Sequence, residues 1–400
     1  MTAVATGLDR VAAADPEVLV HVRGKRVGLL AHPASVTRTL LHAHAVLESA
    51  GAQVVTLFGP EHGYGGEAQD MAPVGSDESG TGGVPRERVR VFSLYGTTFD
   101  ALRPTPDMLT GLDAVVVDLQ DVGARYYTFV WSAALMLEAA AAVGIPTVVL
   151  DRPNPLGGVV LEGAPQRPGY RSFVGLYDVP VRHGLTIAEI TRMVHAQLAL
   201  DAAALVTVPM LGWQRPMYFD QTGLPWVYPS PNMPTLDTAV VYPGGCLIEG
   251  TLLSEGRGTT RPFEVFGGPW VDGQALASAL DGKLPGAVLR PLHFQPTFQK
   301  HAKQPCGGVQ LHVTDRAAFR SYEAYLRILN HLLTQYPDAP RYRTEEYEYV
   351  VDRPAIDLLT GGPEFRQATD AGASLEPWLA AEAAGAAAFE HTRAPFLLYP

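Results

Sequence analysis

Short apolar runs alternate with longer segments of helical spacing over the first 150 residues. The runs are RVGLLAH, AQVVTLFGP, RVRVFSLYG, DAVVVDLQD and IPTVVLDRP, and most of their residues are β-branched or leucine. Continuous runs of this kind are typical of strands buried on both faces of a parallel sheet. Two intervening segments, SVTRTLLHAHAVLESAG with Ser35 or Thr37 as N-cap and YTFVWSAALMLEAAAAVG, are predicted helices. The alternation predicts a doubly wound α/β architecture with a mainly parallel sheet.

The second half of the chain differs from the first in composition and in its predicted elements. From residue 157 to 268 it is rich in Pro and Gly, but the interleaved Trp, Tyr, Phe and Arg are too apolar for a disordered linker, so we expect ordered loops over a site. The last 130 residues contain two predicted helices, FRSYEAYLRILNHLLTQYP and LEPWLAAEAAGAAAFEHTR, and a strand, GVQLHVTD. We predict a larger catalytic domain over residues 1–250 and a smaller α+β subdomain over 251–400.

Composition narrows the classes of partner. The 400 residues are 47% hydrophobic and 18% charged, and the net charge of −11 opposes binding to a nucleic-acid backbone. No run approaches the roughly 18 apolar residues of a membrane span, and the first residues lack a secretory pattern, so a cytoplasmic protein is expected. Cys246 and Cys306 stand far apart without a CxxC motif and are assigned to packing.

Polar, turn-rich loops follow most of the predicted strands. The loops are HPAS, GPEHG, DLQDVGARYY and DRPNP. In doubly wound sheets the ligand site lies beyond the carboxyl ends of the strands. These loops are therefore expected to converge in space.

Glu61 and His62 lie in the GPEHG loop. Its glycines permit unusual backbone dihedrals, and its proline stiffens the entry. The apolar strand before Glu61 and the aromatic Tyr64 after it would desolvate the carboxyl, which favours the protonated form that a general acid needs. His62 is a candidate for holding Glu61 in place. The competing interpretation is that Glu61 caps a helix or forms a structural salt bridge.

Asp118 and Asp121 occur in DLQDVGARYY, followed by Arg125, Tyr126 and Tyr127. The two acids could accept sugar hydroxyls, hold a metal or supply a second catalytic carboxylate, while the arginine could bind a substrate carboxylate. The alternative is an internal Asp–Arg pair that orders the loop. The tyrosines could stack on sugar faces or belong to the core.

Further candidates come from the Gly-rich middle of the chain. SEGRG carries Glu255 and Arg257, but it lacks the GxxxxGK[ST] pattern, so a nucleotide site is disfavoured. VPVRHGLT supplies Arg182 and His183. HExxH and GxSxG are absent from the sequence, which removes the usual support for metalloprotease and α/β-hydrolase interpretations. We predict no cofactor and no metal.

An ordered series of motifs resembles one known family. GPEHG, DLQDVGARYYT, VLDRPNPLGG, VPVRHGLT, PSPNMPT, YPGGCLIEGTLLSEGRGTTRPFE and FLLY, spread from about residue 25 to the end, resemble the exo-β-N-acetylmuramidases of peptidoglycan. The resemblance implies a Rossmann-like domain, a smaller C-terminal subdomain and an active site in the cleft between them. It also implies removal of terminal β-linked N-acetylmuramic acid from the non-reducing ends of peptidoglycan fragments.

The resemblance assigns roles to residues of this chain. The glutamate of GPEHG, here Glu61, is the proposed catalytic residue of that family. The second catalytic role, stabilisation of the oxocarbenium-like centre, falls to a protein carboxylate or to the 2-acetamido group of the substrate. The lactyl carboxylate of the sugar calls for a nearby arginine. The catalytic candidates are Glu61, His62, Asp118 and Glu255, and the substrate-binding candidates are Asp121, Arg125, Tyr126, Tyr127, Arg182, His183, Asn232 and Arg257.

The chain also departs from the family pattern. HPAS replaces an expected NxTG turn, and the expected EGTN reads EGTL at residues 249–252, which bears on sugar contacts more than on reaction type. Two other functions stay open. One is a metal-dependent hydrolase with Asp118, Asp121, His62 and Glu61 as ligands, and the other is a non-catalytic sugar-binding module. The sequence does not determine the oligomeric state.

Overall fold

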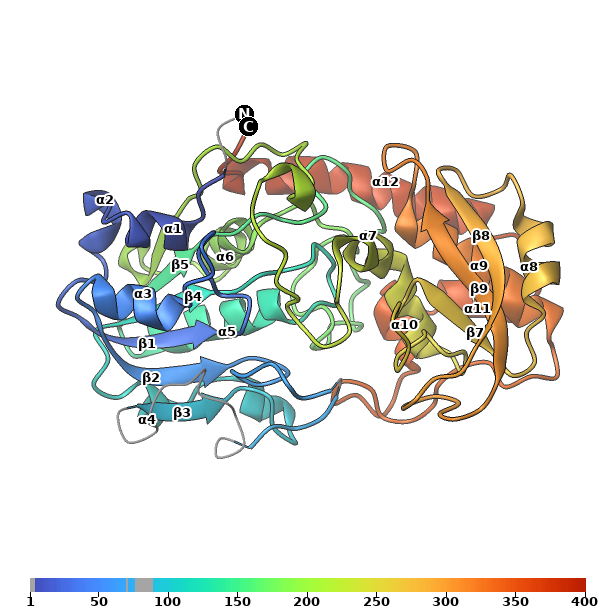
Figure 1. Ribbon diagram of the computed structural model, residues 1–400, viewed down its shortest axis with the longest axis horizontal. Coiled ribbons are helices and arrows are strands. Elements are labelled where there is room, and N and C mark those ends of the chain that lie inside the picture. The colour runs from blue at the N-terminus through green and yellow to red at the C-terminus, as the bar shows by residue number, and fades with distance from the viewer. Residues whose placement is uncertain (1–3, 70, 76–88) are drawn as a thin grey trace.

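The computed structural model describes residues 4–69, 71–75 and 89–400 and shows two unequal halves along its long axis (Figure 1). The larger half is built on a six-stranded sheet whose order is β3-β2-β1-β4-β5-β6. All neighbouring pairs are parallel. The strands are β1 (Arg26–Ala31), β2 (Gln53–Gly59), β3 (Arg90–Ser93), β4 (Ala114–Asp118), β5 (Thr147–Leu150) and β6 (Leu205–Val208).

This sheet confirms the predicted doubly wound fold. The five predicted strands form β1 to β5, and the inner strand β4 is buried at every position. Strand β6 escaped prediction because its sequence, LVTV, is short and lies at the sheet edge, where three of its four residues are only half-buried. The strand order reverses between β1 and β4, so their carboxyl ends flank the topological switch point.

Helices cover both faces of the large sheet (Figure 1). Helix α5 is the buried helix predicted from YTFVWSAALMLEAAAAVG, and α6 begins with a capping box in which Thr186 and Glu189 bond each other's backbone. The α-helices of this half are α1 (Gly7–Ala12), α2 (Pro16–Leu19), α3 (Ala43–Ser49), α4 (Pro106–Leu109), α5 (Phe129–Ala142) and α6 (Ile187–Gln197).

The predicted start of the first long helix was wrong. Helix α3 begins at Ala43, and its N-cap is His42, whose Nδ1 accepts from the His44 N–H. Ser35 instead donates its hydroxyl to the Asp118 carbonyl across the sheet, and the Thr37 hydroxyl accepts from the Leu41 N–H. Because these side chains serve the switch-point loops, neither caps a helix.

The smaller half carries an antiparallel sheet of order β7-β9-β8. The predicted strand GVQLHVTD lies in β9, and both predicted C-terminal helices are present as α9 and α12. This half confirms the expected smaller α+β unit. Its elements are α7 (Leu236–Gly245), β7 (Val265–Gly268), α8 (Gly273–Leu280), β8 (Ala287–Phe294), β9 (Cys306–Val313), α9 (Ser321–Gln335), α10 (Ala355–Thr360), α11 (Glu364–Asp370) and α12 (Glu376–Arg393).

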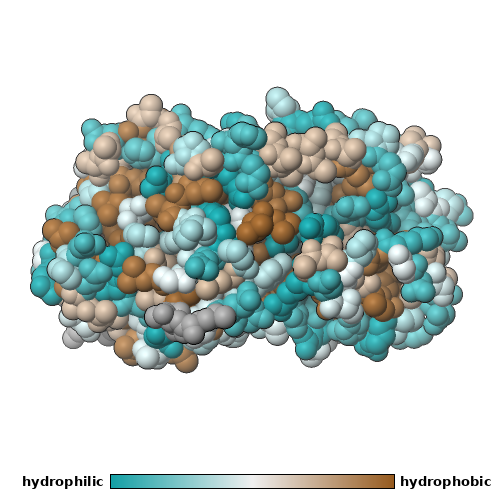
Figure 2. Space-filling model, turned by 90° about the horizontal axis from the view of Figure 1, so that it is seen from above, coloured by the Kyte–Doolittle hydropathy of each residue, from teal (hydrophilic) through white to brown (hydrophobic). Residues whose placement is uncertain are grey.

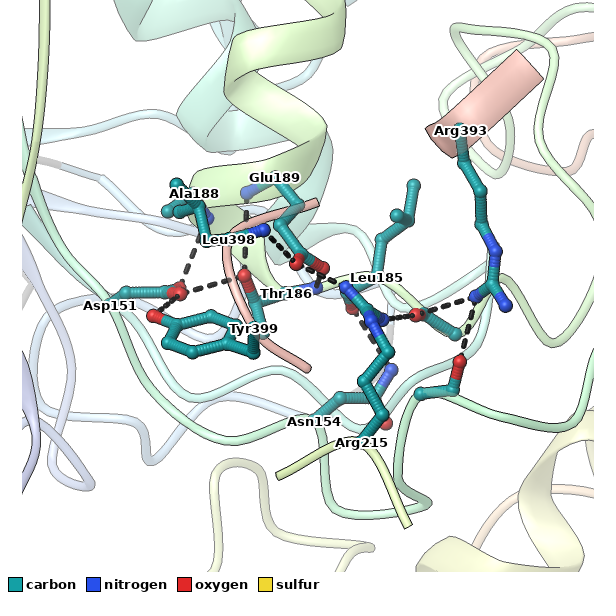
Figure 3. A network of polar contacts seen from close by, with 12 residues as sticks. Asp151, Asn154, Leu185, Thr186, Ala188, Glu189, Arg215, Arg393, Leu398 and Tyr399 are labelled. Atoms are coloured by element: carbon teal, nitrogen blue, oxygen red, sulfur yellow. Dashed lines mark hydrogen bonds and ion pairs between the residues drawn. The ribbon is translucent and has the colours of Figure 1, made fainter. Parts of the chain in front are cut away.

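The end of the chain returns to the larger half. Helix α12 runs along both halves (Figure 1). After it, Tyr399 packs with Val4, Met210 and Trp213 in one apolar cluster. The Tyr399 hydroxyl donates to the Asp151 carboxylate over 2.5 Å, at the carboxyl end of β5 (Figure 3). The last residues therefore belong to the packing of the first sheet. The division of domains at residue 250 stays a prediction.

The surface and the cysteines agree with the expectations from composition. Polar and apolar side chains are interspersed over the elongated face in Figure 2. Neither Cys246 nor Cys306 forms a disulfide in the described structure, and both are buried. Within residues 4–69, 71–75 and 89–400, no helix has the length and apolar character needed to cross a membrane.

Candidate active site

Loops from both halves line one cavity of about 30 Å³. The larger half contributes the loop after β2, the loop that enters α5, and Val174 between β5 and α6. The remainder comes from the Pro-rich loop before α7, from the end of α7 and the loop after it, and from a segment between α9 and α10. The lining residues are Glu61, His62, Tyr126, Tyr127, Thr128, Phe129, Val174, Ser230, Asn232, Met233, Tyr242, Glu249, Arg257, Phe263, Tyr347 and Glu348.

Glu61 reaches this cavity from the carboxyl end of β2. The chain folds back tightly there, since a Cβ on Gly59 would lie 2.3 Å from the Tyr64 nitrogen. The Glu61 side chain is 6% exposed. The hydroxyl of Thr128, the residue before α5, donates to Glu61 Oε2 over 2.6 Å. One carboxylate oxygen is thereby fixed.

His62 shapes the same loop. Its backbone is left-handed, with φ of 71°, which is uncommon for a residue other than glycine. The Nδ1 atom lies 2.8 Å from the Ala68 carbonyl oxygen, which can only accept, so Nδ1 carries the hydrogen. The ring also contacts Phe129 edge-on, with centroids 6.4 Å apart. These contacts fix the conformation of the loop that carries Glu61.

Arg257 brings positive charge to the cavity wall. Its Nη2 lies 2.5 Å from Glu249 Oε1, and the Tyr347 hydroxyl donates to the other oxygen of Glu249 over 2.8 Å. The guanidinium also lies 5.1 Å from the ring centroid of Phe263 and 3.2 Å from Glu255. The arginine is thus held rigidly, with its charge beside the cavity.

Two tyrosines and an asparagine complete the predicted part of the wall. Burial raises the pKa of both Tyr126 and Tyr127 well above its ordinary value, so both hydroxyls are neutral. Tyr126 donates to the Pro243 carbonyl over 2.7 Å, and the Asn232 amide donates to Gln69 over 3.0 Å. The cavity brings together six of the predicted residues, namely Glu61, His62, Tyr126, Tyr127, Asn232 and Arg257.

Asp118 lies elsewhere, at the switch point between β1 and β4. It is fully buried, and both of its oxygens receive hydrogen bonds from Arg152, over 2.5 and 2.8 Å. It does not line the cavity. Nearby, burial and the charge of Arg152 hold the pKa of His32 well below its ordinary value, so His32 is neutral. Asp118 thus belongs to an internal Asp–Arg pair, but its partner is Arg152, which follows β5, and not the arginine of its own motif.

The two other predicted arginines are also engaged inside the protein. Arg125 is fully buried and donates to three backbone carbonyls, with distances of 2.7 to 3.3 Å. Arg182 lies 3.2 Å from Glu162 and donates to the Leu156 carbonyl over 2.6 Å. Neither arginine lines the cavity, and both guanidinium groups bind partners inside the protein.

Three further predicted residues lie outside the wall. Asp121 Oδ2 is 3.3 Å from His183 Nε2 and accepts from the Gly123 N–H. Glu255 is 2.9 Å from the Lys300 ammonium. Burial opposes ionisation of Glu255, but the charges of Lys300 and Arg257 outweigh it, so its pKa is lowered. Glu255 is therefore a carboxylate that fixes Arg257.

Comparison with known proteins assigns the chain to a family. The model described as exo-beta-N-acetylmuramidase NamZ, N-terminal, matches residues 27–237, and its C-terminal counterpart matches residues 240–399. The chain is 41% identical over 398 residues to the peptidoglycan beta-N-acetylmuramidase NamZ of Bacillus subtilis, which covers 99% of this chain and 91% of that protein. The chain belongs to the NamZ family. It is therefore a glycosidase.

Solved structures of related proteins have the same fold. A DUF1343 family protein from Bacteroides fragilis is 31% identical, with a TM-score of 0.85 and complete coverage of both chains. A second DUF1343 family protein from the same organism is 26% identical, with a TM-score of 0.72 and 99% coverage of each chain.

In this NamZ family member the sequence analysis missed several wall residues. Thr128 directly follows the DLQDVGARYY motif. A search for hydroxyl side chains immediately before a predicted helix would have found it. Glu348 lies in the sequence YEYV, almost 300 residues after Glu61, and no motif marks it. Glu249 is the first residue of EGTL, for which the sequence predicts no role in the wall.

The four residues of the metal alternative are not assembled as ligands. Each side chain contacts a different partner: Glu61 contacts Thr128, His62 contacts the Ala68 carbonyl, Asp118 contacts Arg152, and Asp121 contacts His183. Within the described part of the chain, no three His, Cys, Asp or Glu side chains are grouped so that they could hold a metal ion. The geometry thus gives this alternative no support.

Proposed function

We propose that this protein is an exo-acting β-N-acetylmuramidase that releases terminal N-acetylmuramic acid from peptidoglycan fragments, with Glu61 as the general acid. Membership of the NamZ family supports the reaction and the substrate class. The observation that carries the role of Glu61 is its place in the cavity, where Thr128 fixes one oxygen. As the glycosidic bond breaks, the other oxygen gives its proton to the leaving group.

Arg257 is the residue proposed to recognise the lactyl carboxylate. This carboxylate distinguishes N-acetylmuramic acid from N-acetylglucosamine, and a cation beside it would select for it. Of the three arginines singled out in the sequence, Arg257 lines the cavity, whereas Arg125 and Arg182 are used by internal contacts. Asn232 and the two tyrosines would contact the sugar itself.

Substrate entry must widen the cavity. A volume of about 30 Å³ holds one or two water molecules, which is far less than a hexosamine ring needs. The wall is formed by loops of both halves, so a small separation of these loops would enlarge it. We therefore expect the sugar-bound protein to be more open at this point than the structure described above.

The test is release of nitrophenol from 4-nitrophenyl β-N-acetylmuraminide, with the N-acetylglucosaminide as control. The wild type should turn over the muraminide selectively, and Glu61→Gln should lose that activity while keeping its thermal unfolding temperature. Binding without turnover in the wild type would favour a sugar-binding module. Full activity of Glu61→Gln would show that another residue is the general acid.

A further inference from the structure

A lysine outside the cavity wall is connected to Arg257 through Glu255. Lys300 lies in the connection between β8 and β9, and its side chain is 17% exposed. Its ammonium nitrogen lies 2.9 Å from Glu255 Oε2, while Glu255 Oε1 lies 3.2 Å from Arg257 Nε. The two cations therefore share one buried carboxylate. Arg257 lines the cavity, whereas Lys300 does not.

Backbone carbonyls hold the ammonium group of Lys300 in place. Its Nζ donates to the carbonyl oxygens of Ile248, Thr251 and Leu253, over 3.0, 3.0 and 2.9 Å. An ammonium group has three hydrogens, so these carbonyls account for all of them. The contact of Lys300 with Glu255 is accordingly one of charge. With its hydrogens used inside the protein, Lys300 acts on the cavity through Glu255 and not by binding a ligand itself.

The rest of the connection packs against the same stretch of chain. The Thr297 hydroxyl donates to the Gly258 carbonyl over 2.9 Å, and His301 Nε2 lies 2.8 Å from the Leu252 carbonyl oxygen. The two segments approach closely, since a Cβ on Gly258 would lie 2.6 Å from the Thr297 nitrogen. These contacts before and at the end of SEGRG fix the position of Lys300 relative to that motif.

Lys300 is the main counter-ion of Glu255. Burial raises the pKa of Glu255, but the charge of Lys300, and after it the charge of Arg257, lower that pKa below its ordinary value. The distances have the same order, because the carboxylate lies 2.9 Å from Lys300 and 3.2 Å from Arg257. The negative charge of Glu255 is thus compensated mostly from outside the cavity wall.

This compensation matters because Arg257 has a carboxylate at each of two nitrogens. Glu249 accepts from Nη2, and Glu255 faces Nε. Each carboxylate weakens the attraction of the arginine for a further anion, since like charges repel one another across it. Loss of Lys300 would add one net negative charge beside Arg257. That change in charge is the same whichever other groups surround the arginine.

We infer that Lys300 is a positioning residue for substrate recognition, which acts as the counter-ion of Glu255 and so leaves the charge of Arg257 available for the lactyl carboxylate. The inference rests on the proposed glycosidase function and on the role proposed for Arg257. Lys300 takes no part in breaking the glycosidic bond. Its loss is therefore expected in KM for the anionic sugar and not in kcat.

Two substrates separate the effect of charge from that of shape. One is 4-nitrophenyl β-N-acetylmuraminide, and the other is its lactyl methylamide, which has nearly the same shape but no charge. The wild type should have the lower KM for the acid. Lys300→Met keeps most of the side-chain length without the charge. It should raise KM about ten-fold for the acid and less than about two-fold for the amide, with kcat little changed on both.

A double variant tests the role of charge directly. Lys300→Met with Glu255→Gln removes the cation and the anion together, so the local charge returns to that of the wild type. KM for the acid should then fall back to within about three-fold of the wild-type value. A purely structural Lys300 predicts the reverse, because the double variant has lost more contacts than Lys300→Met alone.

Lys303→Met is the matched control, since Lys303 is an exposed lysine three residues away on the same connection. It removes the same charge and should keep KM for the acid within about two-fold of the wild-type value. Lys300→Gln covers the case in which Lys300→Met misfolds, because its neutral amide can still donate to the carbonyls. The expected rise in KM is the same.

The outcomes distinguish the proposals. An unchanged KM in the folded Lys300 variants, an equal rise on acid and amide, or a double variant no better than Lys300→Met would each overturn the role of Lys300 and leave the proposed function intact. A wild type with the same KM for acid and amide would overturn recognition by Arg257, and the role of Lys300 with it. A wild type inactive on both substrates would remove the proposed function itself.

Discussion

The Thr128 hydroxyl donates to Glu61 Oε2 over 2.6 Å, at the point where β2 and α5 meet the cavity. This bond joins two strand-end loops that are 67 residues apart in the chain. Because Thr128 directly precedes Phe129, the first residue of α5, its position is set by the start of a buried helix. The carboxylate of Glu61 is accordingly held in one place before substrate arrives.

Thr128→Val should therefore lower kcat/KM by about ten-fold to a hundred-fold. As Glu61 loses its proton, negative charge builds on its oxygens, and the bond from Thr128 strengthens, which is worth about 1.5–3 kcal/mol for a charged acceptor. Valine keeps the volume of the side chain. Kinetics on the nitrophenyl muraminide check the prediction, and Thr128→Ser, which keeps the hydroxyl, should retain most activity.

Arg257→Lys should raise KM for muraminides about ten-fold and change kcat less. A lysine keeps the charge but cannot hold Glu249 and bind a carboxylate with a planar fork at the same time. Michaelis parameters for the muraminide and the glucosaminide check this role. An equal effect on both substrates would contradict recognition of the lactyl group.

Asp118→Asn should destabilise the fold and leave the chemistry intact. Removing one partner of a buried ion pair costs about 3–5 kcal/mol, because it leaves the charge of Arg152 uncompensated. Urea unfolding measures the loss of stability. A variant that is as stable as the wild type but has lost kcat would instead restore Asp118 as a catalytic candidate.

Asp151 should make the stability of the protein depend on pH. Burial raises its pKa to about 7, although Tyr399 and Thr186 donate hydrogen bonds to it (Figure 3). Because the ordinary pKa of Asp in an unfolded chain is about 3.9, the folded state binds more protons between these values. The contribution of Asp151 to stability is thus greatest below about pH 4 and declines as pH rises to about 7.

Asp151→Asn should abolish this decline. The free energy of unfolding of the variant, relative to that of the wild type, should increase by up to a few kcal/mol between pH 5 and pH 8. Urea unfolding of both proteins at each pH measures the difference, in which the other titrating groups cancel. A constant difference across this range would show that Asp151 titrates at its ordinary pKa.

Much of the fold was predictable because it depends on local patterns. Buried strands of a parallel sheet have continuous apolar sequences, so β1 to β5 and the buried helix α5 were found from periodicity. Glu61 was found because it follows a strand, where parallel sheets place their ligands. Strand β6 and the cap of α3 were missed because an edge strand has a weak pattern, and because Ser35 bonds a distant carbonyl.

The sequence by itself determined the α/β class, the family motifs and the place of Glu61, since each is written in contiguous residues. Only the tertiary structure decided which polar residues meet. Asp118 and Arg125 are in the same motif as Tyr127, yet their side chains are used by internal partners, whereas Tyr127 reaches the cavity. Glu348 lines the same cavity as Glu61, although almost 300 residues separate them in the chain. Such pairing depends on long-range packing, which no local pattern encodes.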